Sequence, residues 1–258
     1  MNTTANVPDW LGVGASVLLV VIAVLVAGWA RLKLTRELLV ASARAFVQLL
    51  IVGALLTFLF TNAGLLGALA WVSGMVVVAG FVAAGRSREL PEARFTALIA
   101  IAVGAATTLG VLLAVGVVEP APSVVVPVGG MVVSGAMTAT NLTMRHVATI
   151  AQQQRADIEA RLALGLTADE AFRPHLQGAV RTALLPAIDS TKVVGLIALP
   201  GAMTGLILAG VEPIVAIRYQ IVVMYMLLAA AAVSAVVAAR LTRRELFDEA
   251  DRLRWVSS

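Results

Sequence analysis

Cysteine is absent from this 258-residue chain, and charged residues make up only 13% of it. The lack of cysteine excludes disulfides, thiolate metal sites and a cysteine nucleophile. About a quarter of the residues in soluble globular domains are charged, so the scarcity of charge excludes an ordinary soluble enzyme. The apolar content of 60% excludes a disordered chain. The mean hydropathy of +0.96 is typical of a polytopic membrane protein.

The sequence also lacks a Gly-x-x-x-x-Gly-Lys-Ser/Thr motif. ATP therefore cannot bind to this chain through a phosphate loop of that kind. We expect a chain that is not an enzyme and has no cofactor of its own. Arginine clusters can bind nucleic acid, but here they flank apolar stretches, so we expect no nucleic-acid partner.

Seven apolar stretches approach or exceed the roughly 20 residues that cross a bilayer as a helix. The sixth is short and interrupted by Pro200-Gly201, and the fifth contains Pro127 and Gly130. No basic segment precedes the first stretch, so we expect a retained helix and not a cleaved signal peptide. The predicted spans are residues 11–30, 38–60, 64–85, 95–118, 124–142, 193–210 and 214–239. The sequence thus predicts a single all-α transmembrane domain, residues 1–258, with seven transmembrane helices.

The basic residues predict the orientation of these spans. Seventeen of the 19 Lys and Arg residues lie in alternate connections, and the other two, Arg44 and Arg218, lie within spans. Because short cytoplasmic loops are enriched in Lys and Arg, we expect the N-terminus outside and the C-terminus in the cytoplasm. The expected location is a bacterial cytoplasmic (inner) membrane, which the chain crosses several times.

Residues 143–192 form the one sizeable polar segment, on the predicted cytoplasmic side. We predict a helix that ends at Gly165, where a left-handed C-cap suits glycine. A second, short helix is expected after Thr167, because Thr167 and Glu170 have the spacing of a capping box. The segment is interpreted either as an amphipathic helix at the membrane surface or as a docking element for a cytosolic partner.

Within this segment, Glu159-Ala160 followed by Gly165 resembles the EAA loop of ABC-transporter permeases, although Arg161 replaces the second alanine of the triplet. Residues 43–53, 127–137 and 181–223 resemble the FetB-type permeases among them, and the resemblance covers nearly the whole chain. It implies a permease subunit that docks on a separate ABC ATPase, which binds the ATP, and that forms a homodimer in the lipid bilayer. The implied ATPase-docking residues are Glu159, Ala160, Leu162 and Gly165.

The same resemblance implies export of a metal ion such as iron, and plant relatives are linked to aluminium tolerance. Broken helices mark transport pathways, because irregular backbone within a membrane must line protein or water. The candidates are Pro127, Gly130 and Met131 in the fifth span, and Pro200, Gly201 and Gly205 in the sixth. Both regions could instead be packing kinks, and Gly201-x-x-x-Gly205 suits close helix packing.

Polar groups within or beside the spans are further candidates. Arg44 and Gln48 lie one helical turn apart; Arg44 is expected to extend to the interface or to contact Asp189 or the docking segment. Asp189 and Lys192 are interpreted as a local ion pair, with a proton relay as the alternative. The polar and hinge residues singled out are Arg44, Gln48, Asp189, Lys192, Arg218 and Gln220.

No metal-binding site can be identified in the sequence, whose two histidines are His146 and His175. An alternative to the ATP-driven permease is a secondary transporter or channel that works alone, driven by an ion gradient. Its coupling charges would be Arg44, Asp189, Lys192 and Arg218. A third alternative is an accessory membrane subunit without a pathway of its own.

Overall fold

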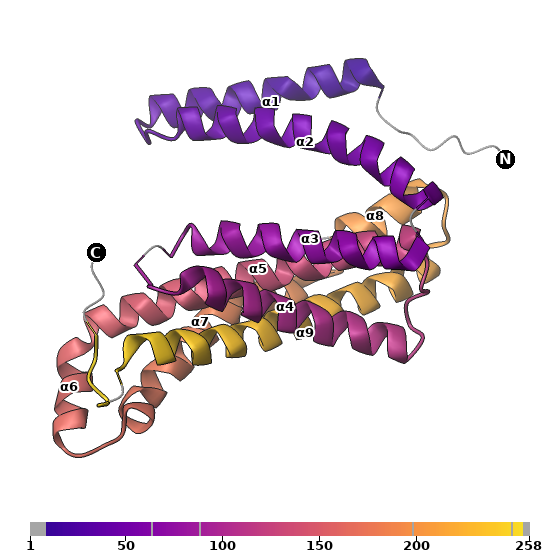
Figure 1. Ribbon diagram of the computed structural model, residues 1–258. Coiled ribbons are helices and arrows are strands. Elements are labelled where there is room, and N and C mark those ends of the chain that lie inside the picture. Colours follow the sequence, from indigo (N-terminus) through magenta and orange to yellow (C-terminus); the bar gives the residue numbers. More distant parts are fainter. Residues whose placement is uncertain (1–8, 63, 88, 198, 249, 255–258) are drawn as a thin grey trace.

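The computed structural model describes residues 9–62, 64–87, 89–197, 199–248 and 250–254, and their regular structure is helical (Figure 1). The helices are α1 (Trp10–Trp29), α2 (Thr35–Asn62), α3 (Gly64–Ala84), α4 (Ala93–Ala114), α5 (Pro122–Gln153), α6 (Arg155–Ala163), α7 (Ala168–Val193), α8 (Gly201–Leu208) and α9 (Pro213–Leu246). The predicted all-α class is confirmed.

Helices α3, α4, α5 and α9 form the packed body of the molecule, and α7 lies against α5 and α9 (Figure 1). Small residues let these helices approach closely. A Cβ atom placed on Gly129 of α5 would lie 2.5 Å from a methyl of Val72 on α3. One placed on Gly104 of α4 would lie 2.9 Å from the Cβ of Ser234 on α9. The body therefore depends on glycine and alanine at its contacts.

Helices α1 and α2 form a hairpin that stands apart from the body along most of its length (Figure 1). Asp9 caps α1 by accepting a hydrogen bond of 2.8 Å from the backbone N–H of Gly12. None of the residues in the most apolar window of α2 is buried, and only 6% of those in α1 are. Both helices thus leave their apolar faces to lipid or to another protein.

Six of these helices, α1 to α5 and α9, are long and apolar enough to cross a membrane. The interruption predicted at Pro200-Gly201 in the sixth stretch, residues 193–210, is confirmed, and it begins earlier in the chain than the sequence indicated. Helix α7 ends at Val193, Gly195 adopts a left-handed φ of 78°, and α8 begins only at Gly201. Pro200 precedes α8 in an extended conformation. A helix does not continue through this residue, because proline lacks the backbone N–H that the helix would need.

Two neighbouring helices are longer than the sequence predicted. Helix α5 continues from its apolar part to Gln153 without interruption, and α7 runs for 26 residues where a short helix was expected. Helix α7 contains Pro174 and Pro186, each of which removes one backbone hydrogen bond. Packing of α7 on α5 and α9 offsets this loss.

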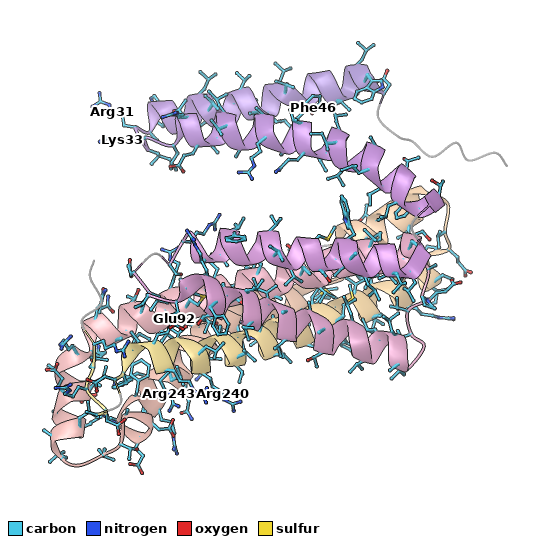
Figure 2. The ribbon with its side chains drawn as sticks, in the orientation of Figure 1. Arg31, Lys33, Phe46, Glu92, Arg240 and Arg243 are labelled. Carbon is cyan, nitrogen blue, oxygen red and sulfur yellow. The ribbon has the colours of Figure 1, made fainter. Side chains whose placement is uncertain are left out.

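The connections between helices gather at the two ends of the molecule. We call the end that contains residues 30–34, helix α6 and the last turns of α9 the basic end (Figure 1). Arg31, Lys33 and Arg243 lie towards this end (Figure 2). Residues 115–121 and 209–212 lie at the opposite end, and α7 runs from the basic end towards α8 (Figure 1).

Candidate functional site

The first candidate site is a hairpin at the basic end, residues 155–175, which we call the coupling hairpin. Helix α6 ends before Gly165, whose φ of 88° confirms the predicted left-handed cap. Thr167 and Glu170 confirm the capping box. The Glu170 N–H donates to Thr167 Oγ1 at 3.3 Å, and the Thr167 N–H donates to Glu170 Oε2 at 3.1 Å. The Thr167 hydroxyl also donates to Glu170 Oε2, and the two hydrogen bonds that the carboxylate accepts from Thr167 hold the pKa of Glu170 below its ordinary value.

The inner face of the coupling hairpin is apolar and closed. Ile158 and Phe172 are fully buried. The Phe172 ring meets Phe247 edge-on at a centroid distance of 5.7 Å. The Asp157 carboxylate links the two helices, because it accepts from Arg161 within α6 and lies 3.0 Å from the His175 ring on α7. The turn between α6 and α7 is therefore held by apolar packing on its inner face and by the contacts of Asp157.

The chain after α9 closes over this hairpin, an arrangement that the sequence did not reveal. Phe247 and Leu253 pair in a short antiparallel bridge, and Arg155 donates to the Leu253 carbonyl at 3.5 Å. Arg243 on α9 forms an ion pair with Asp169 on α7. A cavity of about 450 Å³ remains between these segments. The coupling hairpin is thus attached directly to α9.

The outer face of the hairpin carries three of the four predicted docking residues. Glu159, Ala160 and Gly165 are exposed, and Glu159 makes an exposed ion pair of 2.7 Å with Arg155. Leu162 is different, because it is half-buried against the core. The turn presents Leu164 instead, with 82% of its surface exposed. Leu164 is thus the apolar residue at the tip, and its position next to the capping glycine was the signal available in the sequence.

The second candidate site lies where α7, the interruption after it, α8 and α9 meet. A cavity of about 470 Å³ is lined there by Thr191, Gly195, Leu199, Met203, Gln220 and Met224. Gln220 is only 3% exposed, and its side-chain oxygen has no hydrogen-bond partner among the described residues. Thr191 donates to the Ala187 carbonyl at 2.7 Å. The cavity therefore combines a buried amide, a hydroxyl and thioethers without a charged side chain in its described lining.

The predicted packing role of Gly201 and Gly205 is not fulfilled within the described part of the chain. A Cβ atom on either glycine would meet no atom within 4 Å, and α8 buries none of its residues. Pro127, Gly130 and Met131 lie instead along a groove of about 660 Å³ between α5, α7 and α9. The predicted helix break at Pro127 and Gly130 is wrong, because α5 continues through both residues, whereas the chain is interrupted before Gly201. The two regions border two different hollows, the α5 groove and the α8 cavity.

The charged candidates are distributed over α2, α7 and α9. Lys192 donates to Asp189 at 3.2 Å, which confirms the predicted local ion pair. Arg44 makes no ion pair with Asp189 or the coupling hairpin among the described residues; together with Gln48 it lines a depression on α2. Arg218 is exposed near the start of α9. No group of three His, Asp or Glu side chains suited to a metal ion occurs within the residues that the structure describes.

Glu245 is a buried carboxylate that the sequence analysis missed. It lies near the end of α9 and is 8% exposed. Its oxygens accept hydrogen bonds from the Glu92 N–H, at 3.1 Å, and from the hydroxyl of Thr96. A negative charge at the beginning of α4 is stabilised by the unpaired N–H groups there. Glu245 thus fastens the end of α9 to α4.

Comparison with known proteins adds a family and several relatives. The family described as "Uncharacterised protein family (UPF0014)" matches residues 10–247. The chain is 37% identical over 238 residues to the "Probable iron export permease protein FetB" of Escherichia coli K12, covering 92% of each chain. It is 41% identical to the rice "UPF0014 membrane protein STAR2", covering 93% of this chain and 84% of the relative. It is 37% identical to "Protein ALUMINUM SENSITIVE 3" of Arabidopsis thaliana, covering 93% and 88%. No solved structure matches the chain.

Proposed function

Because the chain belongs to the UPF0014 family, we propose that it is the membrane-spanning subunit of an ATP-driven permease, coupled to a separate ATPase through the coupling hairpin. Relatives at 37–41% identity over most of the chain include one named as a probable iron export permease. The proposed cargo is accordingly a metal ion such as iron, moved out of the cell. ATP binds to the partner and not to this chain.

The observation that carries this proposal is the construction of the coupling hairpin. Its inner face is buried and anchored to α9, so a force on its tip moves a transmembrane helix. On its outer face Leu164, Gly165 and Glu159 are exposed and can meet a partner surface. An exposed apolar residue at a rigid turn can fill a cleft on another protein, where buried apolar side chains contribute most to affinity.

The proposal includes a topology of seven crossings. Helix α7, the interruption after Val193 and α8 together form one broken crossing, in addition to the six apolar helices. The placement of the connections at two opposite ends supports this topology (Figure 1). The basic end then faces the cytoplasm of a bacterial cell, and the start of α1 lies outside.

A transport pathway is proposed along the broken crossing. The α8 cavity and the α5 groove both border α7, whose first turns belong to the coupling hairpin. Much of the apolar surface of α1, α2 and α8 is left exposed by the part of the chain that the structure describes. A second copy of the permease is proposed to cover part of them, which gives a homodimer with two ATPase subunits.

The test is co-purification of the full-length chain from membranes, with mass spectrometry of the retained proteins. We expect the wild type to retain an ABC ATPase, recognised by its phosphate-loop motif. Glu159→Lys and Leu164→Asp should abolish this retention, because both change the exposed outer face of the hairpin. Glu89→Lys is the matched control, since Glu89 is an exposed residue in the connection before α4.

Failure of the wild type to retain any ABC ATPase would overturn the proposal. Metal transport by the purified chain alone, collapsing with the proton gradient, would then support the stand-alone secondary transporter. Equal loss with Glu89→Lys would show that the effect is a general consequence of reversing charge and not of the hairpin.

A further inference from the structure

The beginning of α2 and the turn before it surround a depression of about 650 Å³ with three cations, Lys33, Arg36 and Arg44. Gln48 lines the same depression, one helical turn beyond Arg44. These side chains, which we call the basic stripe, belong to the hairpin that stands apart from the packed body (Figure 1). The interactions described above for the coupling hairpin and the α8 cavity use none of them.

The basic stripe follows one face of the helix. Glu37, Ala41, Arg44 and Gln48 recur at intervals of three or four residues, which brings them to the same side. Arg44 lies nine residues after Thr35, about 14 Å along the axis at 1.5 Å per residue. Side chains on a helix lean towards its N-terminus, so Arg44 extends back towards Arg36. The stripe therefore begins at the basic end and reaches into the apolar part of α2.

The positive charge of the stripe is not neutralised within the described chain. Glu37 is its one carboxylate, and it makes no ion pair with Lys33, Arg36 or Arg44 among the described residues. All four side chains are exposed. Three cations against one carboxylate leave a net positive depression on a membrane helix. Exposed cations beside the apolar part of a membrane helix attract an anionic or strongly polar neighbour.

We propose that the basic stripe binds the phosphate group of an anionic membrane lipid from the leaflet at the basic end. Two guanidinium groups suit phosphate because each can form paired hydrogen bonds to its oxygens. Lys33 adds a third positive charge, and the amide of Gln48 adds a further donor. The N–H groups in the first turn of α2 favour an anion at the same place.

A lipid suits this site better than a soluble phosphate compound because of what surrounds it. Val40 and Ala41 also line the depression, so acyl chains can lie beside the phosphate on an apolar surface. Basic clusters at the cytoplasmic membrane surface attract anionic headgroups in the same way. The site requires neither an ATPase nor the transport pathway, so it stands independently of the proposed function.

The test measures lipid binding to the purified full-length chain in nanodiscs and by native mass spectrometry. The anionic probe is phosphatidylglycerol. Phosphatidylcholine, which has no net charge, is the reference lipid. We expect the wild type to retain phosphatidylglycerol preferentially, and Arg36→Gln and Arg44→Gln each to weaken retention by about fivefold. Arg44→Lys should restore most of the binding, because it keeps the charge. Arg181→Gln is the matched control, an exposed arginine on α7 outside the stripe.

Three outcomes would overturn the proposal. The first is equal retention of the two lipids by the wild type, and the second is equal weakening by Arg181→Gln. The third is complete competition by glycerol phosphate at millimolar concentration, which would assign the site to a soluble phosphate ester and not to a lipid. Circular dichroism of each variant verifies that its helices are intact. Because no readout involves ATP or transport, failure here leaves the proposed permease function untouched.

Discussion

At the residue scale, the charges with clear structural roles lie near the basic end. Glu245 is buried and fastens α9 to α4, and Asp169 pairs with Arg243 to attach α7 to α9. Asp157 bonds to Arg161 and contacts His175 across the coupling hairpin. The links between elements attach the coupling hairpin to the packed body, whereas exposed pairs within one helix, such as Asp157 with Arg161, contribute little stability.

Glu170 gives a prediction about pH. Its pKa is lower in the folded chain than in the unfolded one, so its stabilising effect is fully present above the unfolded-state pKa and is lost as pH falls through the folded-state pKa. We therefore expect the start of α7 to fray as the pH falls below the ordinary range of glutamate pKa values. Hydrogen exchange at the Thr167 amide, corrected for its intrinsic pH dependence, measures this.

Glu170→Gln provides the matched comparison, because glutamine keeps the capping-box hydrogen bond without a titrating carboxylate. Its Thr167 amide should show no loss of protection over the same pH range. The same pH dependence in both proteins would contradict the assignment to Glu170.

At the element scale, the decisive feature is the interruption between α7 and α8. Gly195 lies there with a left-handed φ of 78°, and the residues that follow border the α8 cavity. The interruption turns a stretch that is apolar enough to form a membrane helix into irregular backbone. Such backbone is stable within a membrane only against protein or water.

We predict that Gly195→Ala destabilises the folded chain by about 1 kcal/mol, because a Cβ atom is strained at left-handed φ. Gly178→Ala is the control, since Gly178 lies inside α7 and a Cβ there would meet no atom within 4 Å. Alanine favours helix over glycine, so that control should be unchanged or more stable. Thermal unfolding of the detergent-purified proteins distinguishes them, and equal midpoints would contradict the strain at Gly195.

At the scale of the whole molecule, the proposed topology can be read by labelling. The chain has no cysteine, so each introduced cysteine is a unique label. Ser123→Cys and Glu212→Cys lie at the end opposite the basic end, and Gln153→Cys lies at the basic end. We expect a membrane-impermeant maleimide to label the first two variants in intact cells, and Gln153→Cys only after permeabilisation.

Glu212→Cys is the informative position, because it follows α8. Labelling of this residue on the same side as Gln153→Cys would show that α7 and α8 do not cross the membrane together. Labelling of Ser123→Cys only after permeabilisation would reverse the whole orientation.

Composition and short-range patterns were sufficient to predict the helical class, the resemblance to FetB-type permeases, six of the apolar helices and the turn from Gly165 to Glu170. These features depend on composition and on contacts three or four residues apart, which a sequence displays directly. The local pair of Asp189 and Lys192 was predictable for the same reason.

Which of these residues contact one another became clear from the three-dimensional packing. It placed Leu162 inward and Leu164 outward, attached the coupling hairpin to α9 and buried Glu245 at the start of α4. It also showed that the interruption in the predicted sixth span begins directly after Val193. Each of these outcomes depends on packing between segments far apart in the chain, and hydrophobic periodicity carries no information about which segments those are.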